Sequence, residues 1–157
     1  MLLLSGGVSK GKFDFVPASL KQLGVEEVFY QVAQRPGRPM WFGVGPRGQI
    51  VFGLPGNPVA TMICLSRFVL PALRAMMGAA VPAAERIRLS SAWPGRKTTY
   101  YLPVSLAQDD TAQTRAIARP TQGSGDFLAL AGTDGFVELP PRESGYPENF
   151  VSDLYRW

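Results

Sequence analysis

The chain has 157 residues, 46% of them apolar, so it can bury a core as one domain or as two small ones. Its net charge is +4, but the basic residues are scattered and form no Lys/Arg run, which argues against a nucleic-acid partner. The sequence has no histidine and one cysteine, Cys64, so an internal disulfide is excluded. Catalysis would have to rest on carboxylates, cations, backbone amides or an added metal ion.

The first half of the chain is predicted to alternate strands with helices. In chain order we expect a buried strand over 2–5, a helix over 14–23, a strand over 28–32 and a hairpin of 40–44 with 49–52. Gly24 is well placed to end the first helix. Pro58 begins a long apolar helix, and Pro71 inside it predicts a kink or a break.

The second half is predicted to be all β. The composition changes over 79–85, which we take as a linker between domains at 1–78 and 86–157. Beyond the linker, short strand-like runs are separated by turns, and they cover 86–90, 98–106, 114–119, 135–139 and 150–155. This pattern is typical of a small antiparallel barrel or sandwich.

Two glycine-rich turns each follow a strand and open a helix. The first contains Gly6 and Gly7, and the second is the run 53–58. Unpaired N–H groups and the positive end of the helix dipole favour an anion at such a junction. The residues themselves therefore predict a site for a phosphorylated or oxyanionic ligand.

No stretch is expected to cross a membrane, because Arg67 and Arg74 interrupt the one apolar run that approaches the ~18 residues required. The opening residues have no basic region that would mark a signal peptide, so we predict a cytoplasmic protein. Cys64 is expected to be a buried structural thiol. The aromatic residues at strand or helix spacing are expected to pack in the core rather than against a ligand, and they are Trp41, Phe42, Phe52 and Phe68.

Four motifs in order and at matching spacing resemble the C-terminal part of the molybdopterin molybdenumtransferases, a module that gephyrin also carries. The motifs are 5–9 with Gly11 and Asp14, then 35–39, then 53–59, and finally 122–124 with Gly135. The resemblance implies an α/β fold, with residues 1–78 forming the second half of a three-layer, mostly parallel pterin-binding domain. A small barrel-like all-β domain over 86–157 would follow.

The resemblance also implies a reaction: insertion of molybdate into adenylylated molybdopterin with release of AMP, assisted by Mg²⁺ or another divalent cation. Family members are longer, so this chain is either a fragment or a short protein that needs another polypeptide. The implied partners are a second copy, as in a dimer or another homo-oligomer, or a chain that supplies the missing domains. A non-catalytic module that binds molybdopterin or an anion, or serves as a scaffold, is the alternative.

The site residues are transferred from the family position by position. Those implied to bind the pterin ligand are Gly6, Gly7, Val8, Ser9, Gly53, Pro55, Gly56, Asn57, Pro58 and Ser124. Those implied to be catalytic are Asp14, which would also hold the metal ion, and Arg35 and Arg38.

Each transferred role has a plainer alternative. Ser9 and Asp14 could instead cap the following helix, and Ser124 could be a simple turn residue. Arg35 and Arg38 could belong to a solvated loop, and the family generally has lysine at both positions. Arginine keeps the charge but is a planar bidentate donor, whereas lysine is a compact point charge.

Overall fold

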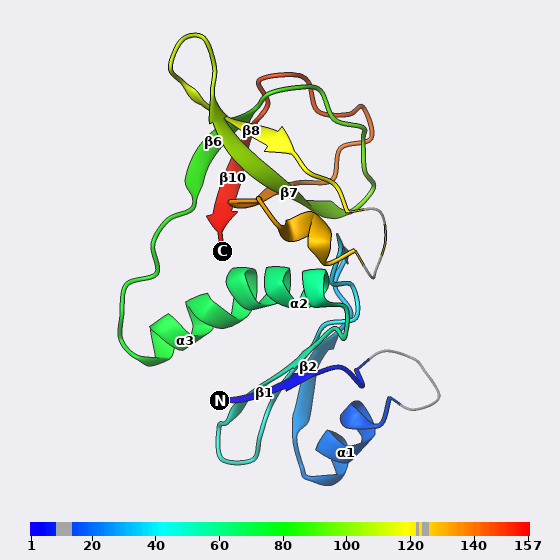
Figure 1. Ribbon diagram of the computed structural model, residues 1–157. Coiled ribbons are helices and arrows are strands. Elements are labelled where there is room, and N and C mark those ends of the chain that lie inside the picture. Colours follow the sequence, from blue (N-terminus) through cyan, green and yellow to red (C-terminus); the bar gives the residue numbers. More distant parts are fainter. Residues whose placement is uncertain (9–13, 122, 124–125) are drawn as a thin grey trace. The chain divides into compact units, whose positions relative to one another are not determined.

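The computed structural model describes residues 1–8, 14–121, 123 and 126–157, and it divides the chain into two compact units (Figure 1). Unit 1 contains residues 1–33 and 37–80, and unit 2 contains residues 34–36 and 81–157. The short segment 34–36 therefore leaves the first unit and joins the second, an exchange that the sequence does not indicate.

Unit 1 is built on a four-stranded sheet in the order β1-β5-β4-β2. The strands are β1 (Leu2–Ser5), β2 (Glu26–Tyr30), β4 (Trp41–Val44) and β5 (Ile50–Leu54). β1 runs parallel to β5, while β4 is antiparallel to both β5 and β2. The described sheet is mixed, so the expected mostly parallel arrangement is wrong in this half. The reason is that the predicted hairpin of 40–44 with 49–52, which is confirmed, pairs β4 antiparallel with β5, and β4 also pairs antiparallel with β2.

Helices cover both faces of this sheet, which confirms a three-layer α/β arrangement. One core cluster joins Phe52 and Leu54 to Cys64 and Val69 of the helical stretch that follows β5. The opposite face of the sheet packs Val51 and its neighbours against the buried Leu20 of α1 (Val16–Gln22). The two clusters follow the alternation of side chains along β5.

The helical stretch after β5 is interrupted, as the proline within it predicts. It consists of α2 (Pro58–Cys64), a π-helical turn η1 (Leu65–Val69) and α3 (Leu70–Met76). Pro71 lies in the first turn of α3, directly after the π-helical turn, so its missing N–H falls where the regular α-helical hydrogen-bond pattern is already broken. Among the described residues, Pro58–Met76 is long and apolar enough to cross a membrane by length and composition, which corrects the expectation that its arginines exclude it. One such helix is weak evidence, because core helices pass the same test.

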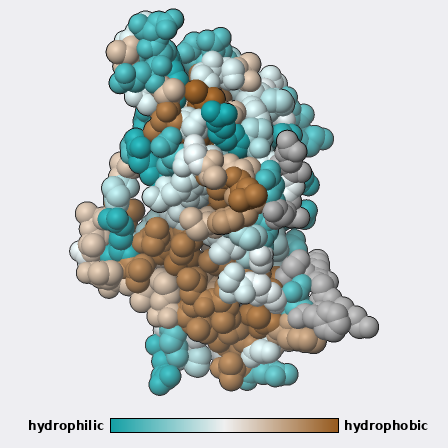
Figure 2. All heavy atoms as spheres, in the orientation of Figure 1, coloured by the Kyte–Doolittle hydropathy of each residue, from teal (hydrophilic) through white to brown (hydrophobic). Residues whose placement is uncertain are grey.

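One surface of unit 1 is rich in exposed apolar side chains. Leu2 and Leu3 of β1 are each 44% exposed, and the row Leu70, Leu73 and Met76 of α3 is exposed as well. Figure 2 shows these two elements as a continuous brown area. An apolar run such as that of β1 is typical of a strand covered on both faces.

Unit 2 is a five-stranded barrel with one short additional strand, which confirms the predicted all-β fold. The barrel strands are β6 (Glu85–Leu89), β7 (Thr99–Gln108), β8 (Thr114–Ala118), β9 (Gly135–Leu139) and β10 (Val151–Arg156). The sheet order β3-β7-β8-β6-β10-β9 closes on itself through a further pairing of β7 with β9. β3 (Gln34–Arg35) adds a parallel edge to β7, and a 3₁₀ turn, η2 (Leu128–Leu130), precedes β9.

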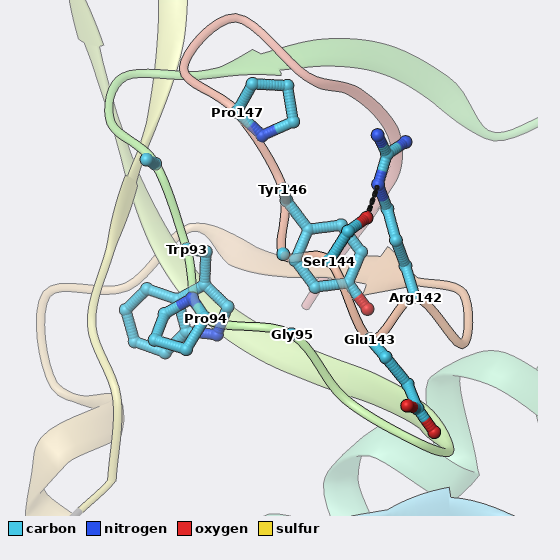
Figure 3. A pocket seen from close by; sticks show the side chains of 10 residues that line it. Trp93, Pro94, Gly95, Arg142, Glu143, Ser144, Tyr146 and Pro147 are labelled. Carbon is cyan, nitrogen blue, oxygen red and sulfur yellow. Dashed lines mark hydrogen bonds between the residues drawn. The ribbon is translucent and has the colours of Figure 1, made fainter.

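Two loops of the barrel unit, whose side chains are drawn in Figure 3, are joined by backbone hydrogen bonds. Trp93 and Tyr146 exchange both N–H···O bonds at 2.8 Å, and Arg96 and Arg142 exchange theirs at 3.0 and 2.8 Å. The loops therefore form a short irregular ribbon, and residues of both line a pocket.

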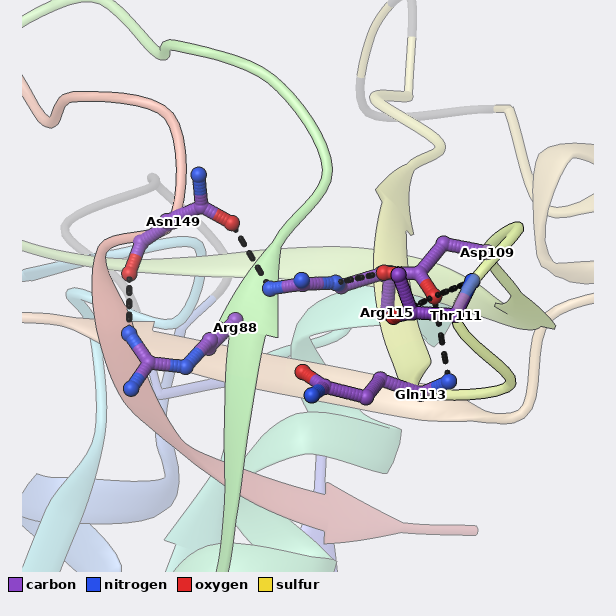
Figure 4. Close-up of polar contacts among 6 residues, drawn as sticks. All are labelled: Arg88, Asp109, Thr111, Gln113, Arg115 and Asn149. Atoms are coloured by element: carbon purple, nitrogen blue, oxygen red, sulfur yellow. Dashed lines mark hydrogen bonds and ion pairs between the residues drawn. The ribbon is translucent and has the colours of Figure 1, made fainter.

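The hairpin between β7 and β8 is held by the Asp109 carboxylate (Figure 4). It accepts hydrogen bonds from the Thr111 hydroxyl at 2.6 Å and from Arg115 Nε at 2.6 Å, as well as from two backbone N–H groups. The Thr111 hydroxyl, and next the Arg115 guanidinium, hold the pKa of Asp109 well below its ordinary value.

We expect the free energy of unfolding of the Asp109→Asn variant to fall less steeply at acid pH than that of wild type. In the unfolded chain Asp109 takes up its proton near pH ~4, while the folded carboxylate resists protonation to much lower pH. The stability that Asp109 contributes is therefore present above pH ~4 and is lost as the pH falls below it. Urea unfolding between pH 7 and pH 2 should show a steeper acid loss for wild type than for the variant.

Thr111→Ala serves as the companion variant, since it removes the largest cause of the shift and leaves the carboxylate in place. It should give an intermediate acid slope. Equal slopes for wild type and Asp109→Asn would contradict the assignment.

Candidate functional site

The two glycine-rich turns lie side by side at the carboxyl ends of two parallel strands. β1 and β5 pair in register from Leu2 opposite Val51 to Ser5 opposite Leu54, so both strands end at the same edge of the sheet. The first turn is bonded to the second strand by Gly6 N–H···O=C of Leu54 at 3.0 Å. Ligands of α/β folds bind preferentially at such an edge.

The first turn depends on glycine for its shape. Gly6 and Gly7 adopt φ of +81° and +68°, a region that other residues reach only with strain. A Cβ on Gly6 would lie 3.9 Å from Gly56 Cα, so the two turns approach backbone to backbone. Val8, which follows, is 1% exposed and packs in the core, so it could present only its main chain to a ligand.

The second turn is held in place by hydrogen bonds from two hydroxyl groups. Pro55 is buried, and its carbonyl accepts hydrogen bonds from Thr61 Oγ1 at 2.5 Å and from Ser5 Oγ at 3.4 Å. Asn57 is the N-cap of α2, and its Oδ1 accepts the Ala60 N–H at 3.0 Å. These bonds fix the turn, and they leave Gly56 exposed at its tip.

Thr61 and Ser5 were not among the predicted site residues. Each acts on the turn through the Pro55 carbonyl, and Thr61 also donates to the Asn57 carbonyl at 2.9 Å. The sequence signal that could have indicated Thr61 is a hydroxyl one helical turn after an N-cap, where it can reach a carbonyl of the preceding loop.

Position 53 requires glycine because neighbouring side chains leave no space for a Cβ atom, and not because of its dihedral angles. A Cβ there would lie 2.7 Å from Val8 Cγ1 and 3.2 Å from Trp41 Cβ. Pro58 occupies the first turn of α2, where a fixed φ suits the helix. The predicted residues of 53–58 thus form one rigid junction, in which Gly53, Pro55 and Asn57 shape the backbone.

The two arginines of the 35–39 loop fall in different units. Arg35 belongs to β3 and lies opposite Tyr100 of β7, and the bond between Arg35 and Pro36 is cis. Arg38 belongs to unit 1, where its carbonyl accepts hydrogen bonds from Val32 and Met40. Both side chains are exposed, which leaves them accessible to an anionic ligand.

The remaining candidates are only partly described. Asp14 is half-buried and directly precedes Phe15, the N-cap of α1. Ser9 and Ser124 lie outside the described residues. Within the part of the chain that is described, His, Cys, Asp and Glu form no group of three or more that could hold a metal ion.

Comparison with known families identifies both units. Residues 1–75 match the sequence model of a family described as "Probable molybdopterin binding domain", and residues 86–154 match that of the "MoeA C-terminal region (domain IV)". The fold and the paired turns thus define a molybdopterin-binding α/β unit followed by a MoeA-type barrel.

Individual relatives agree with these matches. A molybdopterin molybdenumtransferase of Synechocystis sp. is 39% identical over 159 residues, which cover 100% of this chain and 38% of the relative. The enzyme of the same name from Synechococcus elongatus is 36% identical, over 85% of this chain and 36% of the relative. The crystal structure of a molybdopterin biosynthesis MoeA protein from Pyrococcus horikoshii superposes with a TM-score of 0.76 at 28% identity, covering 98% of this chain and 36% of that one.

The chain belongs to the molybdopterin molybdenumtransferase family. It spans just over a third of the length of the curated relatives named above.

Proposed function

We propose that the chain takes part in molybdenum cofactor biosynthesis, in the insertion of molybdate into adenylylated molybdopterin with release of AMP. The observation that carries the proposal is the backbone-to-backbone approach of Gly6 and Gly56 at the carboxyl ends of β1 and β5. Two turns without side chains at their point of contact allow a pterin phosphate to approach main-chain N–H groups closely.

The chemistry would rest mainly on electrostatics. Water adds across the phosphoanhydride bond: its oxygen joins the adenylyl phosphorus, the bridging P–O bond breaks, and the proton goes to the molybdopterin phosphate. Main-chain amides at the two turns would bind the phosphate oxygens, and Arg35 and Arg38 would bind an oxyanion.

Asp14 would supply the carboxylate for a divalent cation. Mg²⁺ is commonly bound through one or two carboxylates together with phosphate oxygens of the substrate and water. A cation that arrives with the ligand would need few protein carboxylates, and Mg²⁺ held by Asp14 would neutralise phosphate charge.

Activity would need polypeptide beyond these 157 residues, because the chain spans about a third of its relatives. The exposed β1 edge and the apolar α3 surface would be covered by a second copy or by a chain carrying the missing domains. A non-catalytic pterin-binding module is the second candidate, and arginine at positions 35 and 38, where the family generally has lysine, favours it.

Asp14→Asn tests the cation role. Loss of one charged ligand should weaken binding of adenylylated molybdopterin in the presence of Mg²⁺ by about ten- to a hundredfold, and should remove most of the effect of Mg²⁺. Titration calorimetry with and without Mg²⁺ measures both quantities. Asp110→Asn, a change at an exposed residue of the β7–β8 hairpin, is the matched control and should bind as wild type does.

AMP release separates the two candidate functions. Release by the chain alone would exclude the non-catalytic module. Binding without release, even when the upstream domains of a relative are added as a separate polypeptide, would exclude the enzyme. Absence of binding under both conditions would contradict the assignment of the ligand site to the two turns.

A further inference from the structure

The two joined loops of unit 2 line a pocket that the proposed function does not use. Its volume is about 650 Å³, and it is lined by 92–95 of one loop and 142–147 of the other. In Figure 3, Trp93 and Pro94 lie on one side and Arg142 on the other, with Tyr146 between them. Most of the lining side chains are exposed, so the pocket is an open depression.

The walls of the pocket are held rigidly. Besides the four backbone bonds between the loops, Gly95 packs so closely that a Cβ there would lie 2.2 Å from the Glu143 carbonyl oxygen. Tyr146 is buried, and its hydroxyl donates to the Pro140 carbonyl at 2.5 Å. A ligand would therefore meet a preformed surface, which lowers the entropic cost of binding.

Two hydrogen-bond donors on the first loop lack acceptors in the described structure. Trp93 Nε1 and Arg96 Nε are buried, and neither has a partner among the described residues. Buried donors are nearly always satisfied in folded proteins, so the first loop has an excess of N–H donors, and of the two residues Trp93 is the one that lines the pocket.

Arg142 lines the pocket, and Arg96 follows the last lining residue of the first loop. Arg96 stacks over the Tyr100 ring at 4.8 Å, and Arg142 lies 5.7 Å from the Phe150 ring centroid while its Nε donates to Ser144 Oγ at 3.2 Å. Within the described part of the chain, neither arginine forms an ion pair with a carboxylate. An oriented, unneutralised guanidinium is suited to bind a carboxylate through two parallel hydrogen bonds.

We propose that this pocket binds a carboxylate-bearing segment of another polypeptide, with the carboxylate on Arg142 and an adjoining apolar side chain against Trp93 and Pro94. Glu143 at the rim reduces the net positive charge, which suits a singly charged carboxylate better than a phosphate dianion. The open shape suits a peptide segment, because small-ligand sites bury most of the ligand. The proposal uses no residue of the glycine turns and stands independently of the proposed function.

The test is a titration of the ¹⁵N-labelled 157-residue chain with the peptide acetyl-Leu-Asp-Leu amide, followed by NMR. We expect saturable shifts of the Trp93 indole N–H and of the amides of 143–146, with a Kd of ~1 mM or tighter. The isosteric peptide acetyl-Leu-Asn-Leu amide should bind about tenfold more weakly or worse, because it cannot form the charge-assisted pair.

Variants assign the effect to Arg142. Arg142→Gln should weaken binding about tenfold, and Arg142→Lys should fall between it and wild type, because lysine keeps the charge but not the fork of donors. Arg86→Gln is the control, since Arg86 is an exposed arginine of the same unit whose Nε lies 3.3 Å from Asp153 Oδ1, and it should bind as wild type does.

Three results would overturn the proposal. They are no saturable shift at ~10 mM peptide, equal binding of the Asp and Asn peptides, and unchanged binding by Arg142→Gln. Inorganic phosphate is the fourth arm of the test: if it shifts the same resonances as strongly as the Asp peptide, the pocket is a small-anion site and the polypeptide assignment is wrong.

Discussion

Leu102→Ala is expected to lower the free energy of unfolding of unit 2 by about 2–5 kcal/mol. Leu102 is fully buried on β7, opposite Val137 of β9, within the core cluster of the barrel. Truncation removes its apolar contacts and leaves a cavity that a closed barrel cannot collapse to fill. Because the unit is small, each kcal/mol should lower its melting temperature by about 4–8 °C.

Leu128→Ala is the matched control for this prediction. Leu128 is 84% exposed in the same unit, so the same chemical change there should alter stability by no more than ~0.5 kcal/mol. Hydrogen exchange measured by mass spectrometry would localise the effect, with protection lost first in β7 and β9. Equal losses for the two variants would show that Leu102 does not lie in a packed core.

The strands of the barrel could be predicted because their signal is local. On β7, Tyr100, Leu102, Val104 and Leu106 all contact the core cluster, which follows the alternation that the sequence shows. The same argument located the hairpin of β4 and β5, since Gly45 and Gly48 mark its turn.

Features that depend on distant partners could not be predicted. β3 contains only two residues, and its pairing with Thr99 and Tyr100 joins it to strands more than sixty residues further along the chain. Likewise, the sequences of β1 and β5 do not indicate that these strands pair in parallel, or that β4 is antiparallel to its neighbours. Strand direction is set by the connections and by packing, which a periodic pattern does not record.

The sequence predicted the two backbone turns of the candidate site but not the side-chain contacts that hold them in place. The sequence located both glycine turns, because glycine and proline clustered where a strand passes into a helix indicate a rigid backbone that a ligand can approach closely. It did not indicate that the Ser5 and Thr61 hydroxyls would meet at the Pro55 carbonyl, since the Ser5 contact joins residues 50 positions apart. The sequence also did not indicate why position 53 needs glycine, because the reason is the close contact of its backbone with Val8.

Gly53→Ala should therefore destabilise unit 1 by about 1–3 kcal/mol through overpacking. The new methyl group would lie 2.7 Å from Val8 Cγ1, and neither Val8 nor Trp41 can move away, because both are buried. Val8→Ala removes the clashing atom, so the double variant should be more stable than the sum of the two single changes predicts, by about 1 kcal/mol or more. Urea unfolding of the four proteins gives this coupling energy directly.

Gly56→Ala distinguishes a role in folding from a role in binding. The nearest atom to a Cβ at Gly56 is the Gly6 Cα at 3.5 Å, an ordinary contact, so stability should stay within ~0.5 kcal/mol of wild type. The methyl group would nevertheless stand where the two turns approach each other, and it should weaken binding of adenylylated molybdopterin. A stable Gly56→Ala protein with unchanged affinity would argue that the ligand does not lie against this turn. For the packing of the turn, the contradicting result is different: additive effects of Gly53→Ala and Val8→Ala on stability would argue that contact with Val8 does not hold Gly53 in place.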